Sequence, residues 1–250
     1  MTKFMGLGWD VGGWMGKNHG LAVCVWDGES DCVVWPSQPF ATAMPKDRLW
    51  RVSDLVEMMK SGDSFHEDIR ITVGVDAPLG YPELFTQLLN GSKVKQTRPD
   101  REIDNRMAYR QTDRYIYKTR SKKPLSASFD RIGNNATVAM LHANQWREEE
   151  GFTLEPQDNS NGSSRTIIEV YPALVKMARY KKVQPFLEKQ MPAGLDSGTD
   201  AYDAAICALY AMAYQTKGKL LPELVHPKVA ELDQARHEGW IFPFEQIESE

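Results

Sequence analysis

The hydrophobic and polar positions of the first forty residues form short runs that predict β-strands. Three runs, FMGLGWDV (4–11), LAVCVWD (21–27) and DCVVWP (31–36), are rich in β-branched and aromatic residues. Asp27-Gly28 lies between the second and third runs and is a hairpin turn signal. We therefore expect three strands joined in an antiparallel meander.

The pattern then changes to the helical period. Residues 46–60 place their apolar side chains on one stripe and predict a helix. Nearly unbroken apolar runs at 69–78 and 166–172 each end at a proline and predict buried strands of a sheet centre. The stretch GTDAYDAAICALYAMAY (198–214) predicts a long, mostly apolar helix.

Residues 81–165 interrupt this order with a long polar segment. The segment has helical character and no strand signals, and its last part, QDNSNGSSR (157–165), has the composition of a flexible loop. The order of elements predicts a mixed α/β sheet, with an antiparallel meander at one end and parallel strands at the other. Since there is no internal repeat or interdomain linker, we expect a single domain over 1–250 that carries a helical, basic insertion at 81–165.

Composition places the chain among globular proteins of a reducing compartment. Hydrophobic residues make up 42% and charged residues 26% of the 250 positions, as in soluble domains. The three cysteines form neither an even disulfide set nor a C-x-x-C metal pair. No apolar stretch reaches membrane-helix length, and MTKFMGLGWD does not have the pattern of a signal peptide. We expect a cytoplasmic protein.

The charge is distributed unevenly along the chain. Between Lys93 and Lys123 there are eleven bases and four acids, so this window carries +7, while the whole chain carries −4. A basic segment on an acidic body suggests an anionic partner such as the phosphate backbone of RNA or DNA. In this window Arg110, Asp113 and Arg114 are candidates for contact with substrate phosphate. The alternative is a salt-bridge network within the protein.

Three acids lie in the predicted strands of the sheet. Asp10 is in the first strand, Asp76 ends the 69–78 run, and Glu169 is in the 166–172 run. Ligands bind beyond the carboxyl ends of strands in open α/β sheets, and buried acids are rare unless they are paired or bind a metal. Asp10 and Asp76 could also start turns, and Glu169 could pair with an arginine of the insertion.

Two further acids, Asp200 and Asp203, lie one helical turn apart at the start of the 198–214 helix. Asp200 has a structural explanation as a first-turn acid beside Thr199, the expected N-cap, whereas Asp203 is the stronger candidate ligand. Several carboxylates in one place require a neutralising cation or a bound proton. Oxygen ligands without histidine or thiolate suit Mg²⁺ or Mn²⁺.

The combination of these motifs resembles a known group. Asp10 in a first strand followed by a hairpin, VDAPLG, IEVYPALVK and TDAYDAAICALYA are together similar to the RNase H-like superfamily, and more closely to an uncharacterised family of predicted nucleases with that fold. EVYP followed by TDAYDAAICAL is also similar to the Holliday-junction resolvase branch.

The resemblance implies metal-dependent hydrolysis of nucleic acid. Asp10, Asp76 and Asp203 would be catalytic metal ligands, and Asp200 or Glu169 would supply a fourth carboxylate. Mg²⁺ or Mn²⁺ would be the cofactor, and the basic insertion would hold the substrate.

Two other functions fit parts of the sequence. WDVGG followed by a hairpin resembles the first phosphate motif of the actin-like superfamily, which suggests a small kinase or ATPase. A binding module without catalytic activity could instead keep the fold and use the basic insertion on nucleic acid. The stretch GGWMGKN (12–18) resembles a phosphate loop only superficially, because Val11 and Asn18 replace the required glycine and hydroxyl residue.

Overall fold

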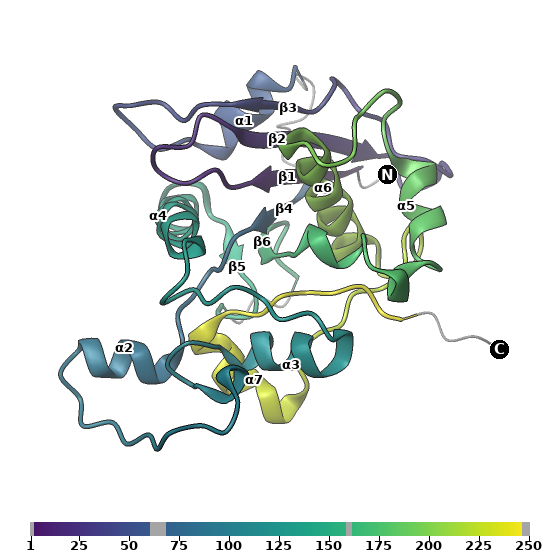
Figure 1. The fold of residues 1–250 in the computed structure, drawn as a ribbon. Helices are drawn as coiled ribbons and strands as arrows, with labels where there is room; N and C mark the ends of the chain where they lie inside the picture. The colour runs from purple at the N-terminus through teal and green to yellow at the C-terminus, as the bar shows by residue number, and fades with distance from the viewer. Residues whose placement is uncertain (1–2, 61–68, 159–161, 247–250) are drawn as a thin grey trace.

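The computed structural model describes residues 3–60, 69–158 and 162–246, which form a six-stranded sheet with helices on both faces (Figure 1). The strands are β1 (Lys3–Asp10), β2 (His19–Trp26), β3 (Phe40–Thr42), β4 (Ile69–Asp76), β5 (Thr153–Leu154) and β6 (Arg165–Glu169), in the order β3-β2-β1-β4-β6-β5. Strands β1, β2 and β3 form the antiparallel meander, and β4, β6 and β5 continue the sheet in parallel. The predicted mixed α/β fold class is confirmed.

The helices divide between the two faces and one side of the sheet. They are α1 (Val52–Met58), α2 (Glu83–Leu89), α3 (Gln111–Arg120), α4 (Ile132–Glu150), α5 (Gln184–Gln190), α6 (Asp200–Thr216) and α7 (Val229–Glu238), with short 3-10 turns η1 (Glu102–Asp104), η2 (Pro172–Leu174) and η3 (Ala178–Tyr180). Helix α6 packs on one face, and α1 and α4 pack on the other. Helices α2, α3 and α7 lie together below the sheet in Figure 1. None of the helices within the described ranges has the length and apolar character of a membrane span.

Three predicted boundaries are wrong. The third strand is β3, because the 31–36 run leaves the sheet after a single bridge and its Val33 N–H donates to the Gln190 side chain at 2.8 Å. The helix predicted over 46–60 begins only at Val52. The insertion contains the edge strand β5, and the predicted 157–165 loop ends where Arg165 opens β6, with 159–161 outside the described residues.

Glycines on the strands let α6 approach the sheet at backbone distance. A Cβ atom added to Gly8 would lie 1.9 Å from the Ala204 carbonyl oxygen, and one added to Gly20 would lie 2.0 Å from the Asp200 carbonyl oxygen. Glycine also faces α6 from β4, where Gly74 is the register partner of Gly8. The strand period of two sends the intervening large side chains of β1 to the opposite core. The face of β1 that contacts α6 therefore carries glycines in place of large side chains, which lets the helix pack directly on the strand backbone.

We expect Gly8→Ala to destabilise the protein by at least about 3 kcal/mol, because the added methyl group meets backbone that cannot rotate away. Gly194→Ala is the control, since Gly194 has a φ of 75° but nothing within 4 Å of the added atom, and its cost is about 1 kcal/mol. Urea unfolding of the three proteins measures both effects. Equal losses for the two variants would contradict the packing argument.

Candidate active site

Asp10 and Asp76 lie side by side at the carboxyl edge of the sheet. They are the last residues of β1 and β4, and they are register partners in the parallel pair. Each follows a glycine that faces α6 by two positions, so the strand period sends both carboxylates to the α6 face. The two strand acids predicted to meet are therefore brought together.

The first turn of α6 brings two more acids to the same region. Thr199 caps the helix, and its hydroxyl accepts the Tyr202 backbone N–H at 3.2 Å, as expected for an N-cap. Asp203 forms an ion pair with Lys176, whose Nζ lies 2.6 Å from Oδ1. Lys176 comes shortly after β6 and its side chain is 40% exposed. Lys176 ends the IEVYPALVK motif, and no local sequence pattern marks it as a site residue.

The electrostatics show that these acids interact. Burial, followed by the charges of Asp203 and Asp200, raises the pKa of Asp10 to about 7, although Lys176 opposes the shift. Burial, followed by the charges of Asp10, Asp203 and Glu169, raises the pKa of Asp76 well above its ordinary value, although Lys176 opposes the shift. Near neutral pH the cluster therefore holds protons that isolated carboxyl groups would have lost.

The chemistry of this acid cluster (Asp10, Asp76, Asp200 and Asp203) suits a divalent cation. All of its donors are carboxylate oxygens, and within the described ranges Lys176 is the one base that forms an ion pair with them. The negative charge is thus only partly compensated. In the side-chain positions described, however, no three His, Cys, Asp or Glu residues are arranged to hold a metal ion. Binding an ion would require these side chains to reorient, and Asp203 to exchange its contact with Lys176.

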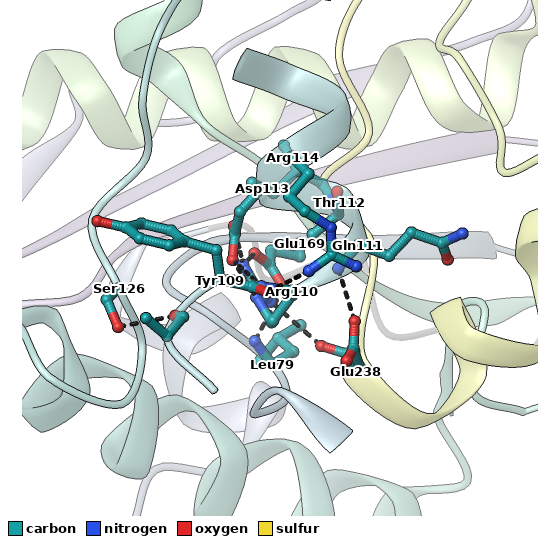
Figure 2. Close-up of polar contacts among 12 residues, drawn as sticks. Leu79, Tyr109, Arg110, Gln111, Thr112, Asp113, Arg114, Ser126, Glu169 and Glu238 are labelled. Atoms are coloured by element: carbon teal, nitrogen blue, oxygen red, sulfur yellow. Dashed lines mark hydrogen bonds and ion pairs between the residues drawn. The ribbon is translucent and has the colours of Figure 1, made fainter. Parts of the chain in front are cut away.

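Glu169 does not join the acid cluster. Its register partner in β4 is Val75, whose side chain belongs to the core on the α1 and α4 face, so Glu169 projects to the face opposite Asp76. There its two oxygens accept hydrogen bonds from the Arg110 guanidinium, each at 2.7 Å, and one also accepts the Leu79 N–H at 2.9 Å (Figure 2). Glu169 therefore has the second of its two predicted roles: it pairs with an arginine of the insertion and is not placed as the fourth carboxylate of the acid cluster.

Arg110 and Asp113, which the sequence offers as contacts for substrate phosphate, are instead buried and paired with each other. Arg110 is 1% exposed and Asp113 is 0% exposed, and Asp113 accepts hydrogen bonds from the Arg110 side chain and backbone (Figure 2). The hydrogen-bonding groups of both side chains are therefore used inside the protein. Arg110 and Asp113 form an internal network with Glu169. The third candidate, Arg114, is only partly buried and donates to the Tyr109 carbonyl oxygen.

The fold and the acid cluster define a mixed α/β protein with a candidate cation-binding edge. Residues 8–197 match a protein family described as "Protein of unknown function (DUF429)", and the chain belongs to that family. The matched region contains Asp10 and Asp76 and ends just before α6. Comparison with curated proteins and with solved structures gave no significant match.

The raised pKa of Asp10 makes stability depend on pH. A carboxyl group with a higher pKa in the folded than in the unfolded state contributes stability that is fully present below pH 3.8 and is lost as the pH rises through about 7. Between pH 5 and pH 8 we expect the metal-free protein to lose about 2–3 kcal/mol more unfolding free energy than Asp10→Asn loses. Denaturant unfolding in EDTA at both pH values measures this. Asp196→Asn, at an exposed position, is the control and should behave like the parent.

The buried network predicts a large cost for removing its cation. Arg110→Met leaves the Asp113 and Glu169 carboxylates buried together, and we expect a loss of about 3–5 kcal/mol. Arg51→Met removes an ion pair in which both side chains are at least half exposed, so its cost should stay below about 1 kcal/mol. Thermal and denaturant unfolding compare the two. Similar losses would mean that the network does not stabilise the fold.

Proposed function

We propose that the protein is a metal-dependent nuclease that hydrolyses phosphodiester bonds of nucleic acid. Asp10, Asp76 and Asp203 would hold Mg²⁺ or Mn²⁺, with Asp200 as the fourth carboxylate. The observation that carries the proposal is the position of Asp10 and Asp76, which are in register at one sheet edge and have pKa values raised by burial and by neighbouring acids that include Asp203.

The fold supports the same function. A three-stranded antiparallel meander, followed by parallel strands on the side of β1, is the arrangement that the resemblance to RNase H-like nucleases implies. The acids also lie at the carboxyl ends of the strands, where ligands bind in open α/β sheets. A fold alone does not determine a reaction, so the proposal depends on the acids.

The protein groups would act by positioning and by charge. A bound Mg²⁺ or Mn²⁺ would supply activation of water and stabilisation of charge on the phosphate. Asp10 and Asp76 are held rigidly by their strands, and Asp203 by the packed start of α6. Lys176, once released from Asp203, could pair its ammonium group with a phosphate oxygen.

The test is cleavage of labelled single-stranded, duplex, hybrid and junction substrates in the presence of Mn²⁺. The parent should cut at least one of them, and Asp203→Asn should lower the rate at least about 100-fold, because one charge that supports the transition state is lost. Asp196→Asn should cut like the parent. Calorimetric titration with Mn²⁺ provides a reading that does not depend on activity, and the affinity should fall in Asp10→Asn and Asp203→Asn.

Two outcomes would reject the nuclease. If no substrate is cut, or if Asp203→Asn cuts as well as the parent, the acid cluster does not perform this reaction. Stabilisation by ATP and not by Mn²⁺ would favour the actin-like kinase or ATPase. Salt-sensitive binding of nucleic acid without cleavage, retained in alanine variants of Asp10 and Asp76, would favour a binding module.

A further inference from the structure

A groove lies at the meander end of the sheet, between the segments that follow β1 and β3. Its walls are the 11–18 loop, which connects β1 to β2, and the 43–49 segment, which follows β3. The lining combines an aromatic ring, long apolar side chains and bases, and it consists of Trp14, Met15, Gly16, Lys17, Ala43, Met44, Pro45, Lys46, Arg48 and Leu49.

The topology places this groove at the same sheet edge as Asp10. Strands β1 and β3 are both antiparallel to β2, so they run in the same direction. The segments that follow them, 11–18 and 43–49, therefore leave the sheet at one edge. Asp10 immediately precedes the first of these segments, so the groove and the candidate active site share this edge of the sheet.

The wall formed by 11–18 is held in a defined conformation. The His19 ring accepts the Gly12 N–H at 3.1 Å on Nδ1 and donates from Nε2 to the Gly13 carbonyl oxygen at 3.1 Å. Helix α4 holds the other side, where the Asn135 amide donates to the Val11 carbonyl oxygen. The Trp14 indole N–H donates to the Thr137 hydroxyl at 2.9 Å, so one edge of the ring is fixed. Because the ring is already held in place, a ligand that binds to it loses little further side-chain entropy.

The surface of the groove is unusual for a solvated loop. Trp14 is 39% exposed and Met15 is 90% exposed, although both have large apolar side chains. The lining contains three bases and no acid. Arg48 pairs with Asp54, whereas Lys17 and Lys46 are exposed and take part in no ion pair among the residues described. Positive charge beside an available ring is the combination that binds single-stranded nucleic acid.

We propose that this groove binds a single-stranded polynucleotide, with a base stacked on Trp14 and phosphates contacted by Lys17 and Lys46. A base must be unpaired to stack on a side chain, so the proposal selects single strands over duplexes. Ring stacking and phosphate charge do not depend on the 2′-hydroxyl, so DNA and RNA strands should bind alike. The inference deepens the proposed nuclease function by naming its substrate as a single strand that reaches the acid cluster along this groove.

The experiment measures binding without cleavage. Fluorescence anisotropy in EDTA follows labelled twelve-nucleotide oligothymidylate and oligouridylate, with a labelled duplex of the same length for comparison. Trp14→Ala should weaken binding to both single strands at least about fivefold, and Trp14→Phe should restore most of it, because a ring is again present. Lys17→Ala combined with Lys46→Ala should lower the slope of log affinity against log salt by about 1.4. Lys189→Ala, at an exposed position on α5, should change neither value.

The results separate this inference from the nuclease proposal. Parent-like binding by Trp14→Ala with an unchanged unfolding midpoint overturns the groove, as does equal affinity for the duplex. Absence of any nucleic-acid binding also overturns it, and would leave the apolar lining as a surface for a protein partner. If the single strands bind as expected but none is cut with Mn²⁺, the groove stands and the nuclease fails. If strands are cut by Trp14→Ala with unchanged affinity, the nuclease stands and the groove fails.

Discussion

The backbone contact between α6 and the sheet is the constraint on which the candidate site depends. Helix carbonyl oxygens lie where the Cβ atoms of Gly8, Gly20 and Gly74 would be, so the helix cannot shift without a clash or a void. Asp203 directly precedes Ala204, which packs on Gly8. The position of its carboxylate relative to β1 and β4 is therefore set by close packing rather than by a loop. The alanines of α6 serve the same purpose, since larger side chains would hold the helix away from the sheet.

Strand parity divides the acids of this edge into two groups, although the charge of Glu169 still acts on Asp76 and both residues line one pocket. Asp10 and Asp76 face α6, where Lys176 on Asp203 is the neighbouring base and burial keeps protons on the strand acids. Glu169 lies one register position from Asp76 in the neighbouring strand but faces the other way, toward Arg110. In the first group four acids face one lysine, whereas in the second the Arg110 guanidinium forms ion pairs with both buried carboxylates, Asp113 and Glu169. The Arg110 network thus stabilises the fold at this sheet edge, while the acids of the acid cluster remain available to bind a cation.

Periodicity and turn chemistry predicted much of the fold, because local pattern determines where buried strands and long helices form. They also predicted that Asp10, Asp76 and Asp203 would meet, since strand ends and the start of α6 lie at one edge. The face of Glu169 could not be read from the sequence, because it depends on the register of β6 against β4. The Glu169 partner of Arg110 and the Gln190 partner of Val33 are distant in sequence, 59 and 157 positions away, so no local signal identifies them.

The basic window at 93–123 is less available for nucleic acid than its charge of +7 suggests. Arg110 and Arg120 are buried, and Arg120 donates to the Tyr180 hydroxyl at 2.7 Å, so these bases join α3 to the rest of the protein. Others, such as Arg101 on Asp104, are paired at the surface. Within 93–123 the exposed bases that form no ion pair among the described residues are Lys93, Lys95, Arg98, Arg106 and Lys118, most of them in the loop before α3. Since surface charge acts over about 10 Å at ordinary salt, this loop rather than α3 is the part of the insertion that can attract a phosphate backbone.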